Sequence, residues 1–105
     1  MTGTTDRLGL RWGLAGGTAL STVAAVREAA RFAQSARFDS FCVSHANEVD
    51  PLVALACLGD DVPGLEEVGT SVVPLYGRHP VALAQQAMTA QNALGGRLTL
   101  GIGAA

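Results

Sequence analysis

The chain has 105 residues, of which 49% are hydrophobic and 15% are charged, and its formal net charge is −2. This much apolar material is sufficient for a packed core and excludes a disordered chain. The seven basic residues are scattered along the sequence, which excludes the basic patch of a nucleic-acid-binding domain.

The first segment predicts a strand followed by a helix. Residues 8–14 alternate in polarity as a strand does. Three nearby glycines are expected to form a loop: Gly13, Gly16 and Gly17. Ser21 or Thr22 can then cap a helix that runs to about Ala36. The core face of this helix is predicted by apolar residues at spacings of three and four: Val23, Val26, Ala30 and Ala33.

The middle of the chain predicts a second strand and a second helix. The strand runs from Phe38 to Ser44, and its successive apolar residues are typical of a parallel strand covered on both faces. Asp50 and Pro51 suit the cap and the first position of a helix. This helix is predicted over 52–58, well buried, and ended by Gly59.

The last third predicts a strand, a helix and a final strand. The third strand covers 67–73 and the fourth covers 98–103. His79 and Pro80 open the helix between them, and Gly95 and Gly96 end it. The expected buried face of this helix is Val81, Ala84, Ala87, Met88 and Leu94.

The predicted order is βαβαβαβ, an α/β fold whose parallel strands are joined by right-handed crossovers. Two architectures fit this order. One is a small open doubly wound sheet, and the other is the first half of a (β/α)8 TIM barrel, whose full form needs about 250 residues. The chain ends on a strand with no covering helix, which favours the half-barrel. We expect residues 1–105 to form the amino-terminal part of a barrel domain, truncated after strand 4.

Few residues carry chemistry of their own. His45 follows the second strand at its carboxyl end, where barrel active sites lie, although an ordinary loop histidine is the alternative. A cofactor can approach the backbone closely at the glycine-rich loop, for which Gly13 is the candidate; turn geometry is the alternative. The sequence has no carboxylate pair and no nucleophile–base pair, which is typical of an enzyme whose cofactor carries the reactive atom.

Cysteine usage and hydropathy bear on location. Cys42 and Cys57 lie in apolar segments as small hydrophobic residues, and no tighter Cys/His cluster predicts a metal site. A membrane-spanning helix needs about 20 apolar residues, and no apolar run in the sequence approaches that length. The N-terminus lacks the features of a signal peptide. We therefore expect a cytoplasmic protein that binds no metal, no nucleic acid and no membrane.

Three segments follow one another in a longer pattern: Gly-Thr-Ser-Val-Val-Pro at 69–74, Arg-His-Pro-Val-Ala-Leu-Ala-Gln-Gln at 78–86 and Gly-Gly-Arg-Leu-Thr-Leu-Gly-Ile-Gly at 95–103. With Phe-Asp-Ser-Phe at 38–41 and Asp-Pro-Leu at 50–52, this pattern closely resembles the luciferase-like monooxygenase superfamily. The resemblance is greatest to the branch that uses the deazaflavin coenzyme F420.

The resemblance implies a (β/α)8 barrel that binds F420, or FMN in a related branch, at the carboxyl ends of its strands. It implies a cis peptide bond between Ser71 and Val72, in a bulge behind the flavin ring. Many F420-using relatives end the second strand in Ser-Asp-His, whereas this chain has Ser-His-Ala at 44–46, so His45 matches either of two positions. Arg37 stands where the family often has a helix-ending glycine. The residues that the resemblance places at the cofactor are Ser44, His45, Ser71, Val72, Gly101 and Gly103, with His45 as the catalytic candidate.

Three functions follow. The first is an F420-dependent oxidoreductase that transfers a hydride to or from a small organic substrate, with His45 polarising or protonating a group near the ring. The second is an FMN-dependent monooxygenase of the same superfamily. The third is a non-catalytic half-barrel that needs a partner half, because four strands leave two unpaired edges and an apolar face. Exposed edges promote association, so we expect a homo-oligomer.

Overall fold

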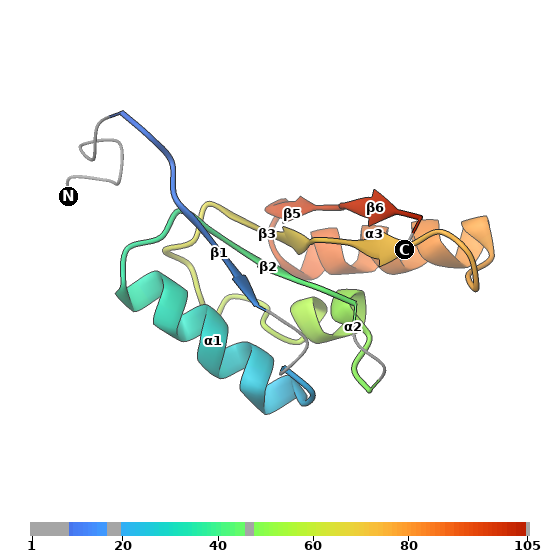
Figure 1. The fold of residues 1–105 in the computed structure, drawn as a ribbon, viewed down its shortest axis with the longest axis horizontal. Coiled ribbons are helices and arrows are strands. Elements are labelled where there is room, and N and C mark those ends of the chain that lie inside the picture. Colours follow the sequence, from blue (N-terminus) through green and yellow to red (C-terminus); the bar gives the residue numbers. More distant parts are fainter. Residues whose placement is uncertain (1–8, 17–19, 46–47, 105) are drawn as a thin grey trace.

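The computed structural model describes residues 9–16, 20–45 and 48–104, and its strands form one parallel sheet with a small extension (Figure 1). Four strands pair in the order β1, β2, β3 and β5. Their bounds are Gly13–Gly16, Ser40–Val43, Glu67–Thr70 and Leu98–Thr99. The order of strands follows the order of the chain, without the reversal of a doubly wound sheet. Of the two predicted architectures, the sheet therefore has that of a (β/α)8 barrel.

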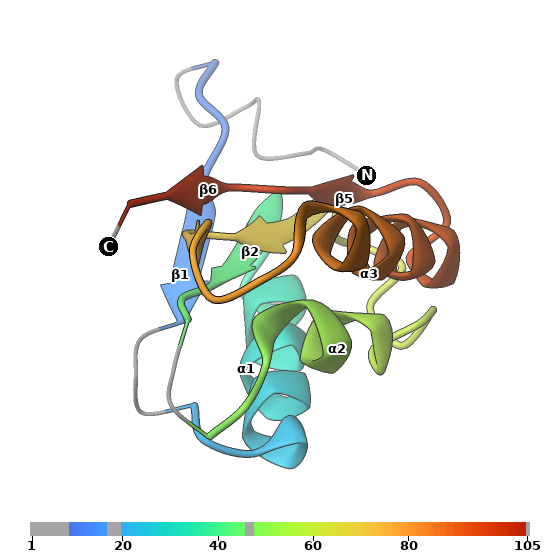
Figure 2. The same ribbon diagram turned by 90° about the vertical axis from the view of Figure 1, so that its right-hand side faces the viewer.

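Three helices lie on one side of this sheet (Figures 1 and 2). They are α1 (Val23–Ser35), α2 (Pro51–Ala56) and α3 (Pro80–Ala93). Each begins where the sequence predicts, because a side chain accepts a hydrogen bond from a free N–H of the first turn. The caps are Thr22, Asp50 and His79, which accept from the backbone N–H of Ala25, Val53 and Val81 at 3.0, 2.9 and 3.1 Å.

The core lies between the helices and the sheet. The predicted face of α1 is confirmed, since Val26, Ala30 and Ala33 are fully buried and Val23 packs against them. β2 contributes Phe41 and Val43 to the same cluster. A second, smaller cluster joins α2, α3 and the chain after β3: Leu52, Val73, Leu83 and Ala90.

β1 begins later than the sequence predicts. It covers Gly13–Gly16, so the predicted strand over 8–14 is confirmed only at Gly13 and Leu14, and the predicted loop at Gly13 and Gly16 is wrong. Leu8 and Gly17 lie outside the described residues. The Trp12 N–H donates to Asp39 Oδ2 at 2.8 Å, and the Trp12 carbonyl accepts from the Asp39 N–H at 2.7 Å. Because Asp39 occupies both backbone groups of Trp12, regular pairing starts at Gly13, opposite Ser40.

α3 buries a different face from the predicted one. Leu83, Ala90 and Leu94 are buried, whereas Val81 is 59% and Met88 63% exposed. The predicted face is therefore wrong except at Leu94. The sequence of α3 is apolar around most of its circumference, so that spacing alone does not select one face.

The third and fourth predicted strands are each divided in two. β4 (Val73–Pro74) follows β3 after two residues, and β6 (Ile102–Gly103) follows β5 in the same way. β4 and β6 pair in parallel as a separate two-stranded sheet. The division of the third strand falls at Ser71–Val72, whose peptide bond is cis, as the resemblance implies.

The side chain of Arg97 ties the loop after α2 to the end of α3. Its guanidinium group donates four hydrogen bonds of 2.7 to 3.2 Å to backbone carbonyls, those of Gly59, Val62, Leu65 and Leu94. These carbonyls lie in loops that have no strand or helix partner of their own, and the fixed fork of arginine suits several acceptors at once.

Among the described residues, none of the helices is long and apolar enough to cross a bilayer.

Arg37 occupies a left-handed backbone conformation at the end of α1, with φ of 65°. The Phe38 N–H donates to the Ala33 carbonyl at 3.0 Å and the Arg37 N–H to the Gln34 carbonyl at 3.1 Å, which is the Schellman pattern of a helix end. A non-glycine residue in this conformation costs about 1–2 kcal/mol. We expect Arg37→Gly to raise the free energy of unfolding by about 0.5–1 kcal/mol, the relief being partly offset by the flexibility of glycine in the unfolded chain.

Urea denaturation followed by circular dichroism measures this change. Ala36→Gly is the matched control, because Ala36 has φ of −84° and gains nothing from glycine; it is expected to lose about 0.5 kcal/mol. Equal losses in both variants would contradict the conformational strain assigned to Arg37.

Candidate functional site

A cavity of about 280 Å³ lies at the carboxyl ends of the strands. It is lined by the two residues that follow β2, by the two residues between β3 and β4, and by the last residue of β4: Ser44, His45, Ser71, Val72 and Pro74. Carboxyl ends of parallel strands meet at one edge of a sheet, which is where barrels hold their active sites. Four of the sequence-predicted site residues, separated by up to 28 positions in the chain, therefore share one cavity.

Hydrogen bonds fix Ser71 against the end of β2. The Ser44 hydroxyl donates to the Ser71 carbonyl at 2.9 Å, and the Ser71 N–H donates to the Val43 carbonyl at 2.9 Å. The Ser44 N–H in turn donates to the Gly16 carbonyl at 3.3 Å. Both backbone polar groups of Ser71 are thus satisfied by β2, and the cavity wall is held where β3 leaves the regular sheet.

Thr70 joins this wall to the chain between β5 and β6. Its side chain is buried, and its hydroxyl donates to the Gly101 carbonyl at 2.8 Å while accepting from the Gly101 N–H at 2.9 Å. The Val73 N–H also donates to the Gly101 carbonyl, at 2.8 Å. The hydroxyl therefore replaces the two backbone groups that a continuous strand would offer to Gly101.

The glycines of the predicted site differ in their positions. A Cβ on Gly101 would collide with the Thr70 carbonyl, and one on Gly103 would lie 2.7 Å from Val72 Cγ2. Gly101 and Gly103 thus pack directly behind the wall of the cavity. Gly13 is not brought to this group, because it opens β1 opposite Ser40, at the amino end of the sheet.

Sequence reasoning missed Thr70 and Pro74 as parts of the site. Both fall within the segment 69–74 that carries the family resemblance, but a threonine and a proline in a predicted strand have ordinary structural explanations. Only the hydrogen bonds between the Thr70 hydroxyl and the backbone of Gly101, 31 residues away, show its role.

A partly buried ion pair supports the loop that follows β4. Arg78 and Asp50 form this pair, with side-chain exposures of 14% and 29%, and Arg78 also donates to Gln86 Oε1 at 2.7 Å. Asp50 caps α2 with its other oxygen. One carboxylate thereby connects the start of α2 to the loop before α3, close to the cavity.

The face of the sheet opposite the helices holds a smaller cavity of about 170 Å³, whose polar groups come from Ser40, Cys42, Glu67 and Thr99. Glu67 and Thr99 are hydrogen-bonded through their side chains. Burial raises the pKa of the Cys42 thiol, and the negative charge of Glu67 raises it further. Cys42 is therefore held as a neutral thiol. Across 9–16, 20–45 and 48–104, no group of three or more metal-binding side chains comes together.

The chain matches the family model of the luciferase-like monooxygenases over residues 9–105, and it belongs to this family. No curated protein matches the sequence.

Two of the solved structures that share the fold illustrate the likeness. The coenzyme F420-dependent tetrahydromethanopterin reductase from Methanopyrus kandleri has a TM-score of 0.77 and 17% identity, over 89% of this chain and 26% of its own. The oxygenating constituent of 3,6-diketocamphane monooxygenase from Pseudomonas putida is a type II Baeyer–Villiger monooxygenase in complex with FMN. Its TM-score is 0.75 at 26% identity, over 91% of this chain and 30% of its own. The chain therefore spans less than a third of either structure, and the predicted partial-barrel fold is confirmed.

Thr70→Val tests the link between β3 and Gly101. Valine keeps the shape of threonine but leaves the partly buried Gly101 N–H without its acceptor, so we expect a loss of about 1 kcal/mol in the free energy of unfolding. Thr70→Ser retains the hydroxyl and is expected to lose less than Thr70→Val. Urea denaturation measures both variants, and a valine variant as stable as the serine variant would rule out the structural role of the hydroxyl.

The raised pKa of Cys42 predicts slow alkylation. The thiolate is the reactive form, so at neutral pH iodoacetamide should modify the exposed Cys57 at least about five-fold faster than Cys42. Mass spectrometry of timed samples measures the two rates, and the Cys57→Ser variant isolates the Cys42 reaction. The difference should vanish in denaturant; a Cys42 that reacts as fast as Cys57 in the folded chain would contradict the prediction.

Proposed function

We propose that this chain is the amino-terminal part of the barrel domain of an oxidoreductase that transfers a hydride between coenzyme F420 and a small organic substrate. The observation that carries the proposal is the cavity at the strand ends, where Ser44, His45, Ser71 and Val72 meet in a member of the luciferase-like family. The segments 69–74, 78–86 and 95–103 favour the F420 branch. The fold shared with an F420-dependent reductase supports this choice.

The residues around the cavity fit one face of a planar deazaflavin ring. Val72 and Pro74 offer an apolar surface, and Ser44, His45 and Ser71 offer polar groups beside it. At about 280 Å³ the cavity is slightly below the range of about 300–1,000 Å³ for whole-ligand pockets. Its size suits the ring rather than the whole coenzyme.

The bound deazaflavin would supply the carbon that carries the hydride. The exposed His45 is proposed to polarise or protonate a group beside the ring. Ser44 donates its only hydroxyl proton to the Ser71 carbonyl, so it presents lone pairs, rather than a proton, to a ligand. Ser71 and Val72 are proposed to support the ring from behind.

An FMN-dependent monooxygenase is the second candidate, supported by the likeness to the FMN-bound structure of the 3,6-diketocamphane monooxygenase constituent at 26% identity. A non-catalytic half-barrel is the third, supported by the open edges of the sheet at β1 and β5. We further propose a cytoplasmic location, since Cys42 and Cys57 are both free, and association into a homo-oligomer.

Fluorescence titration of the purified chain with F420, and with FMN in parallel, tests the proposed function. We expect saturable binding of F420 in preference to FMN. Ser44→Ala and His45→Ala are expected to weaken that binding by at least about three-fold, as loss of one modest hydrogen bond does. Ser40→Ala is the matched control, because Ser40 lies at the amino end of β2 whereas Ser44 and His45 follow its carboxyl end. This substitution should leave binding unchanged.

Each other result has a defined meaning. Tighter binding of FMN would replace the first candidate by the second. Binding of neither cofactor would contradict the proposal that this chain holds a usable part of the site. Equal effects of the Ser40 and Ser44 substitutions would remove the cavity at the strand ends as the place of binding.

A further inference from the structure

Four backbone carbonyls converge on the side chain of Arg97. Three belong to the loop between α2 and β3, those of Gly59, Val62 and Leu65, and the fourth is that of Leu94 at the end of α3. Nε donates to Leu94 at 2.9 Å, Nη1 to Val62 and Leu65 at 2.7 Å each, and Nη2 to Gly59 at 3.2 Å. All three nitrogens of the guanidinium group are thus bound. We call these four acceptors the carbonyl cage.

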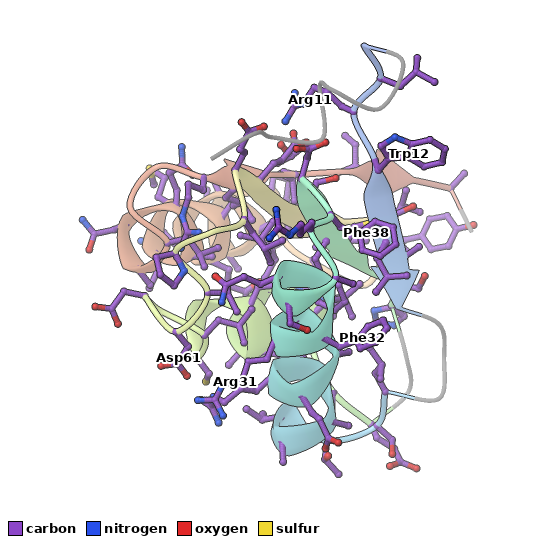
Figure 3. The ribbon with its side chains drawn as sticks, turned by 90° about the vertical axis from the view of Figure 1, so that its left-hand side faces the viewer. Arg11, Trp12, Arg31, Phe32, Phe38 and Asp61 are labelled. Atoms are coloured by element: carbon purple, nitrogen blue, oxygen red, sulfur yellow. The ribbon has the colours of Figure 1, made fainter. Side chains whose placement is uncertain are left out.

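The carbonyl cage holds a positive charge without a carboxylate. Across 9–16, 20–45 and 48–104, none of the ion pairs includes Arg97. Asp61, which lies in the same loop as most of the cage, pairs instead with Arg31 on α1 (Figure 3). The attraction for the guanidinium group therefore comes from the carbonyl dipoles, together with the carboxyl end of α3, where the helix dipole favours a cation.

The loop that carries most of the cage is packed into the core. Val62 and Leu65 are fully buried and belong to the main hydrophobic cluster. A carbonyl that is withdrawn from water without a donor costs free energy, so the loop keeps these side chains buried only while a donor fills the cage. Arg97 also joins β3 to β5, since its own carbonyl accepts from the Val68 N–H at 2.9 Å. One residue thereby fixes both the loop and the strand that follows it.

We propose that the carbonyl cage is a binding site for a planar cation of the alkylguanidinium class, which the chain fills with its own Arg97. The N–H bonds of a guanidinium group lie in one plane, whereas an ammonium group has three donors in a tetrahedral arrangement. Acceptors that meet all three guanidinium nitrogens are matched to the flat donor. Arg97 is only partly buried, so a small cation reaches the cage from solvent once this side chain is removed. The site needs no cofactor, and its test is independent of the proposed function.

Urea denaturation of Arg97→Ala, followed by circular dichroism at constant ionic strength, tests the site. Alanine keeps Cβ, and ethylguanidinium has the atoms that the substitution removes. The urea midpoint should fall in the variant and rise again with the logarithm of the ethylguanidinium concentration, because the ligand binds the folded chain. Ethylammonium should bind at least about ten-fold more weakly, since its three donors leave one carbonyl without a partner. Arg97→Lys should lower the midpoint for the same reason.

Arg11→Ala is the matched control, because the Arg11 guanidinium group is exposed and pairs with Glu66 outside the cage (Figure 3). Ethylguanidinium should not raise the urea midpoint of this variant. An equal rise in the Arg11 and Arg97 variants would overturn the proposal, and so would an Arg97→Lys variant as stable as the unmodified chain. If Arg97→Ala is unfolded without ligand, ethylguanidinium should restore the circular dichroism of the folded chain; a variant that then stays unfolded would equally overturn it.

Discussion

The buried hydroxyl of Thr70 is the contact on which the arrangement of the strand ends depends. It satisfies both backbone groups of Gly101, at the point where β3 has ended and β4 has not begun. β3 pairs with β5 before this point, and β4 pairs with β6 after it. An unpaired buried backbone group costs about as much as a lost hydrogen bond. The hydroxyl thus allows the sheet to be interrupted while the chain on both sides stays in parallel pairing.

The interruption creates the cavity. Because Ser71 and Val72 belong to neither β3 nor β4, their backbone departs from the sheet and faces the residues that follow β2. Ser44 then fixes the Ser71 carbonyl, and Gly101 lets the chain beyond β5 approach the Thr70 carbonyl without a side chain between them. Gly69 has the same role one strand position earlier, against the Thr99 carbonyl. Backbone contacts therefore shape the wall of this cavity, to which Ser44 and His45 add polar side chains.

The cavity at the strand ends and the groove between α2 and α3 have different chemistry. The strand ends present serine and histidine side chains beside an apolar wall, which suits a polar ring system. The groove between α2 and α3 presents leucine, alanine, valine, glutamine and threonine side chains without charge. The partly buried pair of Arg78 and Asp50 connects the loop at the cavity to the beginning of α2.

Local sequence determined where the helices begin and the order of the elements. The resemblance to the family determined the position of the cis bond between Ser71 and Val72. The resemblance also placed Ser44, His45, Ser71 and Val72 at one site, and these four residues line one cavity in the structure. Caps such as Asp50 act on residues three positions away, so they can be recognised in the sequence. The start of β1, the buried face of α3 and the role of Thr70 were decided only by the tertiary structure. The start of β1 and the role of Thr70 depend on partners 27 or more positions away, Asp39 for Trp12 and Gly101 for Thr70. The buried face of α3 depends on the packing of the helix against the rest of the fold, which buries Leu83 and Ala90 of a helix that is apolar on most sides.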